Sequence, residues 1–288
     1  MPTAPERPIA LEQPTTPFGE IVYATDPICS HCWAMEPAWR KLLYHYGQHL
    51  SVHHLYGGLL PGWDGFRDAG AGIARPADVA PHWAEVARHY GQPIDPGVWL
   101  RDPLPSSYPP SIALHAVRML APERETSFLR RIREALFLEA RNIARPELLA
   151  SSAAAEGIDA AQFEMLFHSG IAERAFRHDL EQVGRLGVRG FPTLIFRGRG
   201  GQTTTVHGTQ PYARLEQALL QLTGLPRAGR APTPDEALAA YRIGTTREFA
   251  ELLGLDHGAA IQVLETSGAV RTPVAGDALW SAGAGGIV

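Results

Sequence analysis

The first 57 residues show the pattern of a strand, a helix and a second strand. Residues 20–25 and 50–56 have the apolar and alternating content of strands. Between them, residues 30–47 carry apolar side chains at helical spacing, and Gly47 marks the expected end of that helix. Two strands joined by a helix form a βαβ unit with a parallel strand pair. We therefore expect this part of the chain to begin an α/β domain.

The middle of the chain changes to a mostly helical pattern. Residues 57–110 are dense in Gly, Pro, Trp and Asp, which is typical of loops, around a short helix predicted near 78–90. Five further helices are predicted, at 111–121, 124–142, 146–156, 160–168 and 171–185. The elements expected after them are strands at 193–196 and 203–206, a hairpin turn at 197–201 and a helix at about 211–222.

The last part of the chain predicts a small helical module. A Pro-Thr-Pro linker at 232–234 precedes a helix at 235–241, and the segments 245–255 and 257–267 resemble a helix-turn-helix. A helix that reads DNA needs basic residues, and residues 257–267 contain neither Lys nor Arg. The pattern therefore favours docking or packing over nucleic-acid binding. Because so small a unit has little core of its own, we expect it to dock on the rest of the protein or on a second subunit.

Composition and charge limit the class of protein. Hydrophobic residues make up 45% and charged residues 19% of the 288 residues, as in ordinary globular proteins. The net charge of -4 argues against a nucleic-acid partner. No apolar run reaches the roughly 18 residues that span a bilayer, so no membrane insertion is expected. The first residues lack a secretory signal pattern, which predicts a cytoplasmic protein.

The chain contains two cysteines, Cys29 and Cys32, at the junction between the first strand and the first helix. Backbone N–H groups and the helix dipole at such a position favour a thiolate, so the pair is a candidate redox centre. A zinc site is the main alternative, with ligands from His45, His49 and the pair 53–54, although structural zinc usually takes four ligands. A static disulfide closing so short a loop would add little stability.

Two motifs, in their order around a helical insertion, resemble the thioredoxin fold of the DsbA family. They are Cys29-Ser30-His31-Cys32 and Gly190-Phe191-Pro192-Thr193, which resembles the family's cis-proline loop. Residues 23–33 look closest to the cytoplasmic branch with FrnE-like oxidoreductases and YjbH/SpxH-type protease adaptors. The resemblance covers about 18–225 and implies an α/β thioredoxin fold with a large helical insertion. The implied parts are a flexible arm at 1–18, a thioredoxin-fold domain at 19–57 and 186–225, an inserted helical domain at 58–185, a linker at 226–234 and the small helical module at 235–288.

The resemblance also implies roles for individual residues. Cys29 would be the nucleophile and Cys32 the resolving thiol, and His31 would stabilise the Cys29 thiolate or be an exposed spacer. Pro192 would be cis, leaving the backbone beside it free to pair with a substrate peptide, or it would be an ordinary trans turn proline. By the same resemblance, Phe191 and Thr193 would contact the substrate. Asp26 could assist proton transfer or only form a turn, and Trp33 is expected in the core.

The predicted function is therefore a cytoplasmic DsbA-like oxidoreductase or isomerase. It would exchange disulfides with protein or small-molecule thiols through a mixed disulfide on Cys29, without an organic cofactor or metal. One alternative is a non-enzymatic protease adaptor of the YjbH/SpxH type that binds a client protein. The other is an enzyme similar to the kappa-class glutathione transferases. Two further expectations are that Cys29 has the lower thiol pKa of the pair and that the Phe191–Pro192 bond is cis.

Overall fold

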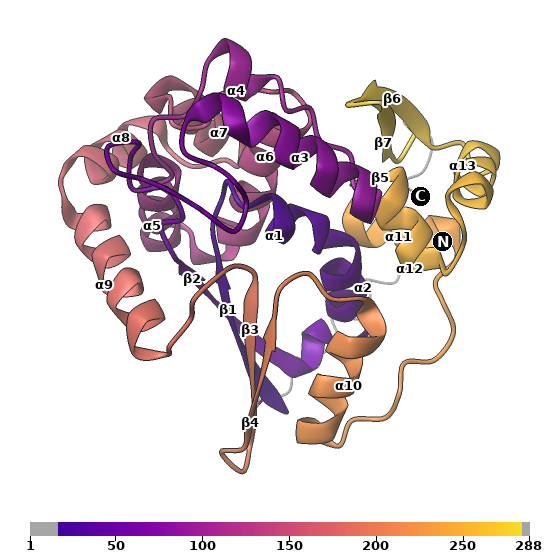
Figure 1. Cartoon of the computed structure of the whole chain (residues 1–288). Coiled ribbons are helices and arrows are strands. Elements are labelled where there is room, and N and C mark those ends of the chain that lie inside the picture. The colour runs from indigo at the N-terminus through magenta and orange to yellow at the C-terminus, as the bar shows by residue number, and fades with distance from the viewer. Residues whose placement is uncertain (1–16, 284–288) are drawn as a thin grey trace, which may run out of the picture.

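A four-stranded mixed sheet forms the centre of the first domain. In the computed structural model, which describes residues 17–283, its strands lie in the order β2-β1-β3-β4. The central strand β1 pairs in parallel with β2 and antiparallel with β3, so the predicted βαβ unit is confirmed. Helices α2 and α10 pack on this sheet through a common apolar core (Figure 1). The bounds are β1 (Gly19–Thr25), β2 (Leu50–Tyr56), β3 (Thr193–Gly198), β4 (Thr203–His207), α2 (Glu36–Tyr46) and α10 (Tyr212–Thr223).

The first predicted helix is divided into two. The sequence predicts one helix over 30–47, whereas α1 (Ser30–Ala34) ends before α2 begins, and a short 3₁₀ turn, η1 (Gly47–His49), follows. Pro37 explains the break, because it has no N–H to donate to the carbonyl four residues earlier and is accommodated best in the first turn of a helix. The consequence is a separate five-residue helix that carries the second cysteine.

The helical insertion contains its own apolar core, separate from the core of the sheet. It packs against the edge strand β2 through α9 and against α1 through α3 (Figure 1). The helix predicted at 124–142 stops at Phe137, and shortly afterwards the chain turns through Ala140 with a φ of 50°. The helices are α3 (Pro76–Tyr90), α4 (Val98–Arg101), α5 (Tyr108–Leu120), η2 (Pro122–Arg124), α6 (Glu125–Phe137), α7 (Pro146–Ala155), α8 (Ala160–His168) and α9 (Ile171–Arg185).

The C-terminal module contains the predicted helices and also a sheet that the sequence analysis did not predict. Its three short strands lie in the order β5-β7-β6, beside the helix-turn-helix formed by α12 and α13. The turn between β6 and β7 has positive φ at Ala275 and Gly276, as tight hairpin turns require. The elements are α11 (Pro234–Tyr241), β5 (Ile243–Thr245), α12 (Thr246–Leu253), α13 (His257–Thr266), β6 (Val270–Val274) and β7 (Asp277–Ser281).

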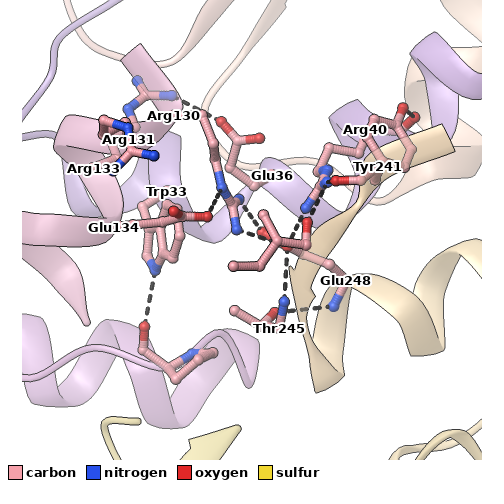
Figure 2. Close-up of polar contacts among 12 residues, drawn as sticks. Trp33, Glu36, Arg40, Arg130, Arg131, Arg133, Glu134, Tyr241, Thr245 and Glu248 are labelled. Atoms are coloured by element: carbon pink, nitrogen blue, oxygen red, sulfur yellow. Dashed lines mark hydrogen bonds and ion pairs between the residues drawn. The ribbon is translucent and has the colours of Figure 1, made fainter. Parts of the chain in front are cut away.

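Glu248 on α12 connects the C-terminal module to the first domain and to the helical insertion. Its buried carboxylate accepts hydrogen bonds from Arg40 on α2 and from Arg130 on α6 (Figure 2). It also accepts one from Gln92, which follows α3. The same carboxylate caps its own helix by accepting from the Thr245 N–H at 3.0 Å. Buried charges need such partners, so this contact joins three segments at one point. The expectation that the tail docks on the protein is confirmed.

Within residues 17–283, no helix has both the length and the apolar character needed to cross a membrane.

Candidate active site

Cys29 lies at the N-terminus of α1, where its sulfur takes the place of a capping side chain. The Cys29 Sγ accepts a hydrogen bond from the backbone N–H of Cys32 at 3.2 Å. Helix N-termini leave such N–H groups unpaired, and bonding them to sulfur favours a thiolate. Both cysteines are thiols here; Cys29 is 4% exposed and Cys32 is fully buried. Of the two sulfurs, a substrate can therefore reach Cys29 more readily.

The loop before β3 lies directly against the Cys29 sulfur. The Phe191–Pro192 peptide bond is cis, which confirms that prediction, and the Cys29 thiol donates to the Phe191 carbonyl at 3.6 Å. Thr193 is buried, and its hydroxyl donates to the Gly190 carbonyl at 2.8 Å. The structure thus brings Phe191 and Pro192 to the thiol, while the hydroxyl of Thr193 holds the loop together.

Gly57, at the end of β2, makes room for this loop. A Cβ atom at Gly57 would lie 1.8 Å from the Cζ atom of Phe191, closer than any non-bonded contact allows. Only glycine therefore lets the Phe191 ring pack where it does. The sequence analysis missed Gly57, and its position directly after a strand that ends near the redox pair is the signal that could have found it.

His31 lines the site, but its ring contacts other residues. Its Nδ1 atom lies 3.3 Å from the Thr209 hydroxyl, and the ring packs beside His82 and Tyr90. Burial lowers the pKa of His31, and the neighbouring His82 and His89 lower it further. A histidine with a lowered pKa is mainly neutral at pH 7, so His31 places no fixed positive charge beside the cysteines.

Asp26 is fully buried just before the cysteine motif. Its carboxylate accepts hydrogen bonds from the N–H of Ile28 at 3.0 Å, the N–H of Leu59 at 2.7 Å and the hydroxyl of Ser107 at 3.0 Å. Burial raises the pKa of Asp26 to about 6, against the lowering effect of these hydrogen bonds. A carboxyl group that titrates near neutral pH is suited to proton transfer. Asp26 is therefore more than a turn former.

The expectation that Cys29 has the lower thiol pKa is wrong in this structure. Burial raises the pKa of the Cys29 thiol above its usual value. Burial would also raise the pKa of Cys32, but a hydrogen bond from Cys29 and the positive charge of Arg133 lower it. The sequence analysis could not include Arg133, because this residue comes from the inserted helical segment.

An apolar cavity of about 250 Å³ opens beside Cys29. Most of its wall comes from the segment 59–99, which the sequence predicted only as loops around a short helix at 78–90. Its aromatic lining consists of Trp63, Phe66, Trp83, Trp99 and Phe191. Ligand sites are commonly concave and apolar with a few polar groups, and here the polar side chains of the lining are Cys29, Ser30, His31, Asp68, His82 and Arg189.

The remaining candidates of the sequence analysis lie elsewhere. Trp33 is fully buried, stacks on Phe137 and donates to the Pro93 carbonyl at 2.9 Å, so it is a core residue as expected. His53 lies 3.9 Å from Glu20, and His54 lies 3.6 Å from Glu125. In the part of the chain that the structure describes, no group of three or more His, Cys, Asp or Glu side chains is placed to hold a metal ion.

Comparison with known proteins gives the same fold and a more specific relationship. A family model described as Thioredoxin matches residues 23–217. The ClpXP adapter protein SpxH of Halalkalibacterium halodurans is 32% identical over 82% of this chain and 78% of its own length. The cytosolic disulfide reductase DsbM of Pseudomonas aeruginosa is 26% identical with a TM-score of 0.55, over 70% of this chain and 99% of that one.

The structure of a protein from Nitrosomonas europaea, described as a putative protein disulfide isomerase, has a TM-score of 0.58 at 24% identity. The match covers 71% of this chain and 95% of that one, and at this identity it shows a similar fold alone. The family model covers more than half of the chain, and the SpxH relative extends the match beyond it. In this chain the cysteine pair and the cis-proline loop lie against each other. This chain therefore belongs to the DsbA family of thioredoxin-fold proteins, in the branch that contains the SpxH-type proteins.

Proposed function

We propose that this protein exchanges disulfides with client proteins through a mixed disulfide on Cys29. The observation that carries the proposal is the position of the Cys29 sulfur, which caps a helix, contacts the cis-proline loop and opens onto an apolar cavity. A thiol in this position borders a cavity that a client side chain can enter, and the adjacent proline loop offers a surface that can pair with a polypeptide.

The exchange takes place in two steps that conserve atoms and electrons. A client thiolate attacks the Cys29 sulfur of the oxidised pair, the Cys29–Cys32 bond breaks, and its electron pair leaves on Cys32. A second client thiolate then attacks the mixed disulfide at the client sulfur and releases Cys29. Two electrons pass from the client to the pair, and the reverse sequence reduces a client disulfide. Asp26, with its pKa of about 6, is suited to carry the proton that Cys32 gains or loses.

The loop and the cavity define the kind of client that fits. Pro192 has no N–H, and the extended backbone around it can pair with a client strand next to the sulfur. The aromatic cavity can take an apolar side chain close to the client cysteine. Both contacts use features of a polypeptide, so the proposal favours protein clients over small thiols.

Purified protein tests this proposal directly. Wild-type protein with dithiothreitol should accelerate the reduction of insulin, and Cys29→Ser should abolish the effect. Cys32→Ser is the matched variant, because it keeps the attacking sulfur and removes the resolving one. It should accumulate a mixed disulfide with the client, visible by mass spectrometry. A Cys29→Ser variant with full activity would refute the proposal.

An adapter function is the second candidate, and the sequence relationship favours it. The relative from Halalkalibacterium halodurans that matches 82% of this chain is described as a ClpXP adapter protein. The cysteine chemistry and the adapter role can be separated by experiment. Trapping on Cys32→Ser identifies a client. If the chain is an adapter, purified ClpXP should degrade this client faster in the presence of wild-type protein, and Cys29→Ser should accelerate the degradation as well. Unchanged degradation would remove this candidate.

The similar structures do not favour the kappa-class transferase alternative. A 2-hydroxychromene-2-carboxylate isomerase has a similar structure, with a TM-score of 0.50, but it is only 16% identical to this chain. A likeness at that level shows the fold alone.

A further inference from the structure

Arg133, on the inserted helix α6, lies behind the resolving cysteine. Its side chain is fully buried, and one of its terminal nitrogens donates to Glu36 at 2.9 Å. The other donates to the Thr25 hydroxyl at 2.6 Å and to the Asp26 carbonyl at 3.2 Å. Thr25 and Asp26 come just before the cysteine motif, and Glu36 follows Cys32 by about one helical turn. The guanidinium therefore bridges the segments that come before and after the cysteine motif in the sequence.

These hydrogen bonds hold α6 against the first domain, yet stability alone does not require a buried cation at this position. Charged side chains are costly to bury, and a hydrophobic residue of similar size often gives equal or greater stability. The Nε–H of Arg133 has no hydrogen-bond partner among the described residues, so its burial is incompletely compensated. The buried position of the Arg133 guanidinium is better explained by a negative charge that forms nearby during disulfide exchange.

Thr25 connects the guanidinium to the sulfur. Because Arg133 donates to the Thr25 oxygen, the hydroxyl hydrogen of Thr25 is left to point elsewhere. The hydrogen bond that Thr25 makes to Cys32 lowers the pKa of that thiol, in addition to the charge of Arg133 itself. A preorganised donor and a buried cation thus act on the same sulfur.

We propose that Arg133 tunes the redox pair: it stabilises the Cys32 thiolate directly and through Thr25, and so makes the Cys29–Cys32 disulfide a stronger oxidant. The proposal rests on the disulfide exchange proposed above. When a client thiolate attacks Cys29, the S–S electron pair leaves on Cys32, and Arg133 stabilises this leaving group. A leaving thiol of lower pKa leaves faster, and a stabilised reduced form raises the reduction potential.

Other ionisable groups also act on the pair. Asp26 is negatively charged above about pH 6 and its charge raises the pKa of Cys29, and Glu36 partly neutralises Arg133. Burial raises the pKa of Tyr23 well above its usual value, so this phenol stays neutral at working pH. Arg133 supplies the positive charge that lowers the pKa of Cys32. Removing Arg133 and removing Glu36 should therefore change the potential in opposite directions.

The test measures the equilibrium of the full-length protein with glutathione at pH 7. Arg133→Met should lower the fraction of reduced pair, with a change of about tenfold in the equilibrium constant, which corresponds to about 30 mV. Arg133→Lys, which keeps the charge, should lie closer to wild type, and Glu36→Gln should shift the equilibrium the other way. Arg131→Gln is the control, because Arg131 lies on the same helix but pairs with Glu156 at the surface.

The alkylation rate of the thiols against pH gives a second measurement. In Arg133→Met the titration of Cys32 should move to higher pH, whereas Arg131→Gln should leave it unchanged. If Arg133→Met does not fold, the direction in which Glu36→Gln shifts the equilibrium with glutathione tests the proposal on its own. An unchanged equilibrium in Arg133→Met, or shifts in the same direction for Arg133→Met and Glu36→Gln, would overturn the proposal. A wild-type protein without exchange activity would instead refute the proposed function.

Discussion

Replacing Glu248 by Gln should destabilise the folded protein by about 3 kcal/mol at pH 7. Burial alone would raise the pKa of this carboxyl, but the charges of Arg130 and Arg40 and its hydrogen bonds lower the pKa from 4.5 to about 2. At 1.36 kcal/mol per pKa unit, this difference corresponds to about 3 kcal/mol of stability. Removal of one partner from a buried ion pair typically costs about 3–5 kcal/mol, which agrees with this value.

The effect of this substitution should depend on pH. Because the folded pKa lies below the unfolded value, the carboxylate stabilises the fold fully above about pH 4.5, and this contribution is lost as the pH falls toward 2. At pH 3 the difference in stability between wild type and Glu248→Gln should therefore be roughly half of its value at pH 7.

Urea unfolding, followed by tryptophan fluorescence and circular dichroism, measures this difference at both pH values. Glu265→Gln is the matched control, because Glu265 is an exposed glutamate of the same module, on α13. Equal unfolding midpoints for wild type and Glu248→Gln would refute the role assigned to Glu248. A difference that stays the same at pH 3 and pH 7 would show that its charge is not the cause.

Three further predictions concern the site and the linker. Burial raises the pKa of Asp26 from 3.8 to about 6, so its negative charge destabilises the fold at higher pH. Asp26→Asn should therefore increase the free energy of unfolding by about 2–3 kcal/mol at pH 8 and leave it unchanged at pH 3, and it should slow disulfide exchange. Gly57→Ala should displace Phe191, cost about 1–3 kcal/mol and slow mixed-disulfide formation, whereas Gly62→Ala, with open space around it, should not. After proteolysis near Pro232, the two fragments should elute together in size exclusion, and a freely separating tail would contradict the docking seen here.

The sequence predicted those features that local spacing determines. Strand alternation and helical spacing were sufficient for the βαβ unit and the helical insertion, whereas the proximity of Cys29 to the Phe191–Pro192 loop was implied only by the resemblance to the DsbA family. The break at Pro37 was also visible in the sequence, because a proline inside a helical pattern ends or displaces the helix. The short strands of the C-terminal module were missed because segments of three to five residues carry too little alternation.

Features that depend on distant parts of the chain could not be predicted in this way. Arg133 lies about 100 residues from the cysteines, and only the packing of α6 brings it behind Cys32. One signal was present: Arg133 stands among Leu129, Ile132 and Leu136, in the buried stripe of its helix. A charged residue in an apolar stripe indicates a buried partner or a functional role, although it does not identify the partner. The raised pKa of Cys29 was missed for the same reason, because burial is a tertiary property.

The segment between α10 and α11 is held against the domain from which it emerges. The Ala228 N–H donates to the Tyr46 hydroxyl at 2.7 Å, and Arg230 pairs with Glu236 at 2.6 Å. With α12 fastened at its other end, the chain is a fixed spacer and not a flexible tether. For a tether, the effective concentration of one bound partner near another depends on linker length. Here packing sets the separation between Cys29 and the surface of the C-terminal module. Extra residues in the segment between α10 and α11 would therefore lengthen the chain without moving these two surfaces apart.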